Sequence, residues 1–159
     1  MMFRDLRRVG QKLPDKEAKE ILSEEKRGVL SLIGDGGYPY GAPLDHWYSE
    51  EENALFFHCA KEGHKIDAIE AQDKATYCVI RDDGAEEGSW IRHFRSVIAF
   101  GRIRIVEDEE KKREICTRLV RMHTDDEAYL EKELTQSFPR VCCLELKIEH
   151  LSGKKVREA

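Results

Sequence analysis

The sequence predicts a mainly β fold with short helices, in which six antiparallel strands form a closed or nearly closed barrel. Three observations support this expectation. Apolar and polar residues alternate with a period of two in six separate segments. Short polar turns such as "DGG" and "SEEEN" join the early segments as hairpins. The fifth segment is long and has a glycine in its interior, which indicates a bend or bulge that helps a sheet to curve.

The elements follow from residue patterns taken in order. Pro14 suits a first helical turn, acidic residues gather early, and Lys26 and Arg27 close the segment, so a helix is predicted over residues 14–27. The barrel should then occupy about residues 28–151. Strands are predicted at 28–34, 38–49, 54–59, 74–82, 94–108 and 141–156. Further helices are predicted up to about residue 71, at 109–123 and at 125–134.

Single residues refine this assignment. Pro39 and Pro43 cannot donate to a strand ladder, so the second strand should lie at an edge or contain a bulge. Gly101 should mark the bend or bulge of the fifth strand. Asp108 should cap the helix that follows it. The apolar stripe of that helix follows the 3–4 spacing and comprises Ile115, Cys116, Leu119, Val120 and His123.

Length, composition and charge exclude several classes of protein. The chain has 159 residues, of which 40% are apolar and 37% charged, and its net charge is −5. These values are typical of one soluble domain that buries its own core, so residues 1–159 are treated as a single domain. Acids and bases are interspersed without a basic stripe, so no nucleic-acid partner is expected. No apolar run approaches the ~20 residues of a membrane helix and no signal peptide is recognisable, so we expect a cytoplasmic protein.

The cysteines fit a reducing compartment. Their number is odd and no CxxC pair occurs, so we expect free thiols that mostly pack as small hydrophobic side chains. The five are Cys59, Cys78, Cys116, Cys142 and Cys143.

The stretch "FFHCAKEGHKIDAI", residues 56–69, places a polar cluster between a predicted strand and a predicted helix. One interpretation is a metal site. His58, Cys59 and His64 could supply ligands, with His46 as a further candidate. However, the separation of the two histidines within the stretch matches no standard zinc spacing, and no second Cys/His pair lies at a suitable distance. We therefore expect no metal here.

A second interpretation of this stretch is an anion site. The amino end of a helix offers free N–H groups and partial positive charge, which suit a phosphate. Gly63 would let the backbone approach the anion closely, and His64 and Lys65 would add donors. A third interpretation is a solvated helix start with surface lysines. The residues alone leave the choice between the second and third interpretations open.

Four segments in this order resemble the nitroimidazole-resistance (Nim-type) branch of the pyridoxamine 5'-phosphate oxidase-like flavoproteins. They are "GVLSLIGDGGYPYGAPLDHWY", "LFFHCAKEGHKIDAI", "FRSVIAFGRIRIVEDEEKK" and "LSGKK". The likeness runs from about Gly28 to Lys154, nearly the whole chain. It implies a Greek-key split β-barrel that binds flavin mononucleotide (FMN), and a homodimer with FMN at the subunit interface.

The resemblance also implies residues that bind the cofactor. Lys65, with Gly63 and His64 beside it, would hold the FMN phosphate. His58, Cys59 and Ala60 would lie along the flavin and its ribityl chain. The segment beside the isoalloxazine would comprise Ala42, Pro43, Leu44 and Asp45. From the partner subunit, Trp90 and Ser96 are candidates, although Trp90 could equally be an interface residue without a ligand role. For His46 we favour a rim position with a satisfied hydrogen bond over a contact with the ring.

The function implied is that of an FMN-dependent oxidoreductase. Electrons would pass from a nicotinamide donor, NAD(P)H, through FMN to a small acceptor such as a nitro compound or a quinone. His58 is the candidate proton donor or substrate contact. Oxidation of pyridoxamine phosphate itself is not expected, because "GAPLDHWY" contains no arginine and "LSGKKVREA" does not resemble the ending of that enzyme. The alternatives are a non-catalytic flavin- or haem-binding module, acting as a carrier or sensor, and an interaction domain without a cofactor.

Overall fold

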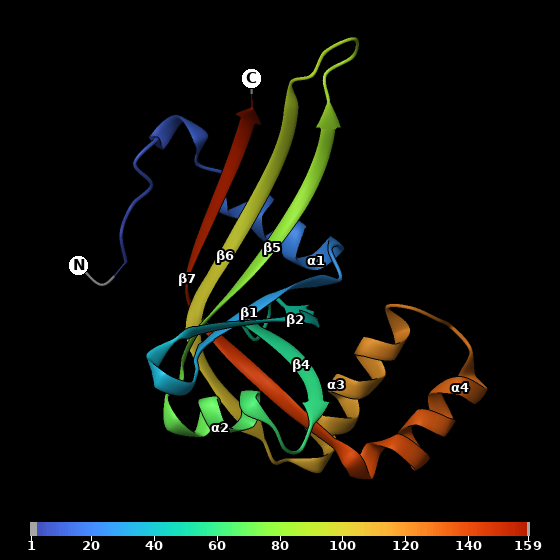
Figure 1. Cartoon of the computed structure of the whole chain (residues 1–159). Coiled ribbons are helices and arrows are strands. Elements are labelled where there is room, and N and C mark those ends of the chain that lie inside the picture. The colour runs from blue at the N-terminus through green and yellow to red at the C-terminus, as the bar shows by residue number, and fades with distance from the viewer. Residues whose placement is uncertain (1–2, 159) are drawn as a thin grey trace.

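A computed structural model describes residues 3–158 of the chain (Figure 1). Its main feature is a seven-stranded sheet with the strand order β2-β1-β5-β6-β7-β4-β3. All neighbouring strands in this order pair antiparallel. The strands are β1 (Arg27–Ile33), β2 (Pro39–Asp45), β3 (Trp47–Ser49), β4 (Ala54–Ala60), β5 (Lys74–Ala85), β6 (Arg92–Val106) and β7 (Val141–Glu158).

The helices are short and lie around the sheet. The α-helices are α1 (Asp15–Glu24), α2 (His64–Ala71), α3 (Glu109–Arg121) and α4 (Glu127–Lys132). Short 3₁₀ turns cover Val9–Gln11, Asp35–Gly37 and Phe138–Arg140, and a π-helical turn covers Glu133–Ser137. The mainly β fold predicted from the sequence is confirmed, and Asp108 caps α3 as expected, since its carboxylate accepts a hydrogen bond from the backbone N–H of Lys111 at 2.9 Å.

The structure has seven strands where six were predicted, because the predicted second strand divides at His46. Its two parts, β2 and β3, lie at opposite edges of the sheet. The chain therefore crosses from one edge to the other within a single residue, and β2 also contacts β4. The sheet curls into a barrel that backbone pairing does not close. Pro39 and Pro43 lie on the edge strand β2, as predicted, where a missing N–H breaks no inner ladder.

Two hydrophobic cores hold this arrangement. The larger core fills the barrel and also receives one face of α1, through Ala18, Ile21 and Leu22. The smaller core lies on the other side of β4, β6 and β7, beneath α3. Its buried members are Ala54, Phe56, Val106, Ile115, Cys116, Leu119, Phe138 and Cys143. Consecutive residues of β4 and β7 thus alternate between the two cores, as the period of a strand requires.

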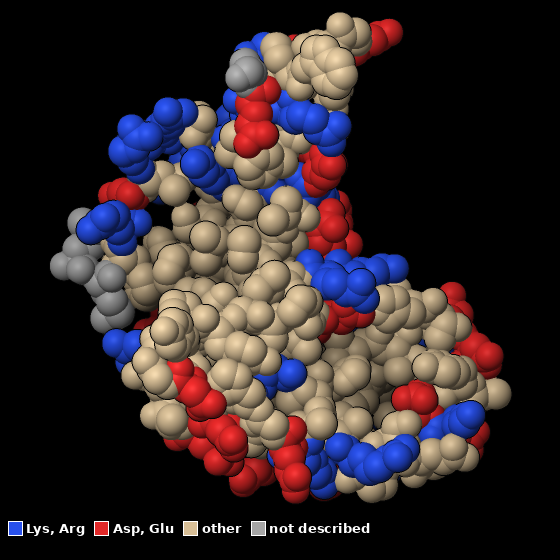
Figure 2. Space-filling view, in the orientation of Figure 1, with Lys and Arg blue, Asp and Glu red and all other residues tan. Residues whose placement is uncertain are grey.

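One face of the sheet is left uncovered by helices in the part of the chain that the structure describes. It is built by β1, β5 and β6 with the adjoining part of β7, and we call it the outer face. Figure 2 shows a broad surface free of Lys, Arg, Asp and Glu across the middle of the molecule, over these strands. Its apolar side chains include Val29, Ile33 and Ile80, the last of which is 62% exposed. An uncovered apolar face of this kind is typical of an interaction surface.

Candidate functional site

The joint between β4 and α2 has the properties of an anion site. Gly63, which precedes the helix, has a φ of +131°, a conformation that side chains with a Cβ rarely adopt. No described atom lies within 4 Å of where its Cβ would be, so the joint is open. No side chain among residues 3–158 caps α2, which leaves the N–H groups of His64 and Lys65 without an intrahelical partner. Lys61 is exposed and Lys65 half-buried at the same end.

His64 is held by the turn between β1 and β2. Its Nε2 accepts a hydrogen bond from the backbone N–H of Asp35 at 3.2 Å, and its ring lies 4.0 Å from that of Tyr40. A neutral ring that accepts at Nε2 carries its proton on Nδ1. The turn therefore orients His64 and leaves Nδ1 as a donor at the amino end of α2.

His58 and Cys59 point to opposite sides of β4. His58 shares the side of Phe56, which faces α3, and lies near the carboxylates of Asp45 and Glu133. Its side chain reaches the surface, but surrounding protein atoms desolvate it and lower its pKa, while the two carboxylates act in the opposite direction. Cys59 instead packs against the barrel core. This strand geometry therefore prevents the two side chains from both contacting one side of a flat ring.

Asp45 links the end of β2 to α3. Its carboxylate oxygens accept hydrogen bonds from Arg27 Nε at 2.6 Å and from His123 Nε2 at 2.9 Å. Burial acts to raise the pKa of Asp45, but Arg27 and His123 outweigh it and hold the pKa below its usual value. His123 was expected in the apolar stripe of α3. It is exposed instead and anchors the end of that helix to the barrel edge.

The other residues predicted on β2 lie along the free edge of the sheet. Ala42 is buried, Pro43 is exposed, and Leu44 is half-buried with its carbonyl oxygen accepting a hydrogen bond from the Tyr77 hydroxyl at 2.7 Å. His46, the residue after this strand, is almost fully buried and bonds the Tyr77 hydroxyl and the Leu22 carbonyl oxygen. Both ring nitrogens of His46 thus have oxygen partners within the chain, as the favoured interpretation requires, but the residue is buried rather than at the rim.

Trp90 and Ser96 lie away from the β4–α2 joint within one chain. Trp90 is 98% exposed in the loop between β5 and β6, and Ser96 is half-buried on β6. Figure 1 shows that this hairpin projects from the barrel at the end opposite to α2. The structure therefore brings together residues 42–45 and 58–65, and it leaves Trp90 and Ser96 apart from them.

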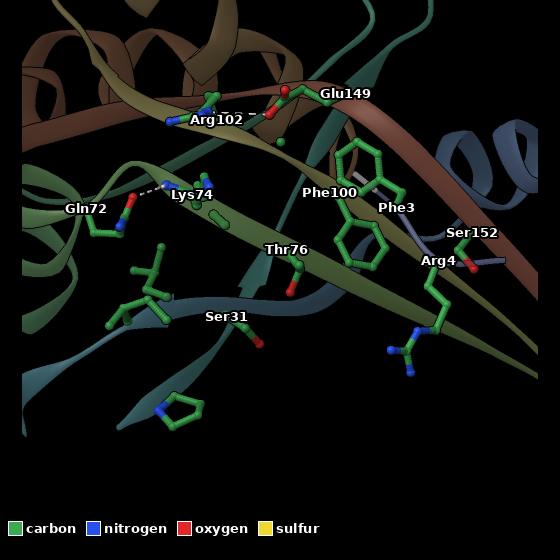
Figure 3. Close-up of a pocket in the computed structure, with 15 residues that line it drawn as sticks. Phe3, Arg4, Ser31, Gln72, Lys74, Thr76, Phe100, Arg102, Glu149 and Ser152 are labelled. Atoms are coloured by element: carbon green, nitrogen blue, oxygen red, sulfur yellow. Dashed lines mark hydrogen bonds and ion pairs between the residues drawn. The ribbon is translucent and has the colours of Figure 1, made fainter. Parts of the chain in front are cut away.

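Sequence reasoning missed a cavity of about 680 Å³ on the outer face. Figure 3 shows Phe3, from the N-terminal segment, beside Phe100 on β6; their ring centroids are 5.5 Å apart. Arg102 lines the cavity but is paired with Asp73 and Glu149. The alternation of β5 and β6 could have placed their residues on this face. Nothing in the sequence indicated that the N-terminal segment would lie across it.

The fold is an open antiparallel barrel in which an uncapped helix follows directly on strand β4. The sequence profile of the pyridoxamine 5'-phosphate oxidase family matches residues 14–155. The chain therefore belongs to this family, whose fold is the split barrel. No curated protein matches the chain in sequence.

Solved structures with the same fold include three that illustrate its range. A candidate 5-nitroimidazole antibiotic resistance protein from Bacteroides thetaiotaomicron is 20% identical, with a TM-score of 0.72 and coverage of 91% of this chain and 85% of that one. An FAD-binding protein from Mesorhizobium loti is 22% identical, with a TM-score of 0.64 and coverage of 92% and 97%. An FAD- and haem-binding protein from Mycobacterium smegmatis is 19% identical, with a TM-score of 0.72 and coverage of 91% and 72%.

Two further findings concern the described residues. Within residues 3–158, no group of three or more His, Cys, Asp and Glu side chains could hold a metal ion. None of the helices in this range is both long enough and apolar enough to cross a membrane.

Proposed function

We propose that this protein binds FMN and acts as an oxidoreductase that passes electrons from a nicotinamide donor to a small acceptor. The observation that carries the proposal is the uncapped amino end of α2 behind the open Gly63. Its free N–H groups and the neighbouring Lys61 and Lys65 suit a phosphate group. Membership of the pyridoxamine 5'-phosphate oxidase family and the flavin-binding neighbours of the same fold support a flavin as the phosphate-bearing ligand.

The residues around the joint fit the rest of such a cofactor. His64 would donate from Nδ1 to the phosphate, since its Nε2 is occupied by Asp35. The outer side of β2 faces no strand in the described sheet, so its backbone polar groups could bond the edge of a ring. A bound flavin supplies the chemistry of hydride acceptance and electron transfer. The chain supplies binding, orientation and a side of the site open to substrate.

His58 is the residue we propose for proton transfer or substrate contact. It lies on the side of β4 that faces α3, with Asp45 and Glu133 nearby. Its lowered pKa keeps much of the imidazole neutral at pH 7, so that the ring can accept a proton and return it. Cys59, which packs against the barrel core, would contact a cofactor only through its backbone.

We further propose that FMN lies between two copies of the chain. The β5–β6 hairpin, which carries Trp90 and Ser96, projects at the end opposite to α2 (Figure 1), so only a second copy could bring these residues to the cofactor. The apolar outer face provides a surface for that contact.

The first test is an absorption spectrum of the purified protein before and after incubation with FMN or FAD and desalting. We expect the bands of oxidised flavin at about 370 and 450 nm, with FMN retained in preference to FAD. A Soret band would replace this proposal by haem binding, and a protein that retains no chromophore would contradict it.

The phosphate site is tested by Lys65→Ala, with Lys16→Ala on the exposed face of α1 as the matched control. Removing a charge-assisted hydrogen bond contributing on the order of 1.5 kcal/mol should weaken FMN binding about tenfold. Fluorescence titration of FMN measures this effect, and equal affinities of both variants would remove Lys65 from the site.

Catalysis is tested by oxidation of NADH and NADPH with nitro compounds and quinones as acceptors. His58→Ala should lower turnover by about 10²-fold while FMN binding persists. Wild-type protein that binds FMN but oxidises neither donor would favour a carrier or sensor.

A further inference from the structure

Two consecutive cysteines of β7 each face another cysteine, on opposite sides of the sheet. Cys142 points into the barrel core and is the register partner of Cys59 on β4. Cys143 points into the smaller core, where its Sγ lies 3.7 Å from the Sγ of Cys116 on α3. Cys143 is fully buried and Cys116 is 9% exposed. The β sheet thus separates two thiol pairs with different surroundings.

The two thiols of the Cys116–Cys143 pair differ in the direction in which their pKa is shifted. The contact with the Cys143 sulfur and the positive charges of Lys112 and Arg113 lower the pKa of Cys116, against the effect of burial. The contact with Cys116 and burial raise the pKa of Cys143, which stays protonated and can donate. A disulfide requires an S–S distance of about 2.05 Å. The two sulfur atoms would therefore approach by about 1.7 Å from their present contact distance.

We propose that Cys116 and Cys143 form a redox-responsive pair, which an oxidant of the peroxide class converts to a disulfide between α3 and β7. The Cys116 thiolate attacks one oxygen of hydrogen peroxide, the O–O bond breaks, and hydroxide leaves a sulfenic acid behind. The Cys143 sulfur then attacks the Cys116 sulfur. The S–S bond forms, the S–O bond breaks, and the hydroxyl group leaves as water with the Cys143 proton. Two thiols lose two electrons and one peroxide becomes two waters.

The other pair is less suited to this reaction. Burial raises the pKa of Cys59 to about 12, so its thiolate is scarce at neutral pH. Burial also raises the pKa of Cys142, against the lowering effect of its contact with Cys59. Cys78 lies on β5, away from both pairs, and has no cysteine as a register partner. These differences assign the reaction to Cys116 and Cys143.

The new bond would act on the surroundings of His58. Cys143 is the register partner of His58, and α3 ends beside His123, which bonds Asp45. A disulfide would fix α3 against β7 and shift its contacts with the barrel edge. Oxidation should therefore change the environment of His58, whether or not a flavin is bound there.

The experiment oxidises the full-length protein with hydrogen peroxide after reduction and removal of the reductant. Free thiols are then counted under denaturing conditions, and tryptic peptides are mapped without reduction. We expect the five free thiols to fall to three. The linked peptides should be residues 114–118, which contain Cys116, and residues 141–147, which contain Cys143. Dithiothreitol should restore five thiols and separate the peptides.

Single variants separate the neighbouring cysteines. Cys116→Ala and Cys143→Ala should prevent the link, whereas Cys142→Ala and the control Cys78→Ser should retain it. If a core variant fails to fold, the peptide map of the wild-type protein still tests the link to Cys116, and Cys142→Ala then assigns the link to Cys143. Retention of all five thiols, or a link from residues 141–147 to the peptide that contains Cys59, would overturn the proposal.

Discussion

The hydrogen bonds of the buried His46 cannot all be made by a neutral ring. Its Nε2 faces the Leu22 carbonyl oxygen at 2.7 Å, so Nε2 must carry a proton and donate. Its Nδ1 lies 2.8 Å from the Tyr77 hydroxyl, which also lies 2.7 Å from the Leu44 carbonyl oxygen. One hydroxyl proton can serve only one of these two acceptors. A protonated ring would complete the network, but burial opposes the charge and lowers the pKa of His46.

This lowered pKa predicts acid destabilisation. Because the folded state binds the His46 proton less readily than the unfolded chain, stability is retained above about pH 6.5 and falls as the pH decreases toward the folded-state pKa. One such group changes the free energy of unfolding by at most about 1.4 kcal/mol per pH unit. Urea unfolding between about pH 7.5 and 5.5 measures the slope. His46→Gln, which cannot titrate, should give a flatter slope than wild type, and identical slopes would contradict this explanation.

Gly101 is required by a close approach of two backbones. The sheet register shifts between Phe100 and Gly101, as the glycine in this long strand predicted. A Cβ on Gly101 would overlap the carbonyl oxygen of Lys147 on the neighbouring strand β7. We expect Gly101→Ala to lower the free energy of unfolding by about 2–3 kcal/mol, because backbone atoms must move. Urea unfolding with Gly10→Ala as the control tests this, since nothing lies within 4 Å of a Cβ at Gly10. Equal stabilities of the two variants would refute it.

At the scale of elements, periodicity located the helices and strands, and tertiary pairing moved their ends. The first helix was predicted to reach Arg27 but ends at Glu24, because Arg27 instead begins β1 opposite Asp45. The predicted strand over 38–49 divides at His46, where contacts with α1 and β5 turn the chain to the other edge. Both changes depend on contacts between residues that are distant in sequence. Local sequence patterns hold no information about such contacts.

The cap of α3 is an element whose contribution can be measured. Asp108 accepts the Lys111 N–H, and α3 in turn carries Cys116 and ends beside His123. Asp108→Ala should lower the free energy of unfolding by about 1 kcal/mol. Asp108→Asn should lower it much less, because asparagine can also cap the helix. Thermal and urea unfolding distinguish these outcomes. A loss of the same size in both variants would show that charge at the helix end, rather than the cap, matters.

At the scale of the whole molecule, the sequence predicted the barrel and the joint at residues 58–65 but could not assemble a complete site. The proposed phosphate site is local, since Gly63, His64 and Lys65 are consecutive, and so it was visible in the sequence. The network of Asp45 with Arg27 and His123 joins three distant segments and was not visible. Trp90 and Ser96 belong to a projecting hairpin (Figure 1), and the role that we propose for them requires a second copy of the chain.

The proposed dimer makes oligomeric state and flavin retention interdependent. Ile80 lies on the outer face and is 62% exposed in one chain, so Ile80→Asp would place a charge in the proposed apolar interface. Val9→Asp is the matched control, because Val9 is 73% exposed in a turn outside this sheet. Sedimentation equilibrium should give about twice the chain mass of 18.5 kDa for wild type and Val9→Asp, and a shift toward monomer for Ile80→Asp. FMN affinity should fall when dimerisation is lost, because the proposed contacts from Trp90 and Ser96 would come from the other copy. If the wild-type protein is monomeric and still binds FMN fully, oligomeric state and flavin retention are independent. The cofactor would then contact only residues 42–65 of a single chain.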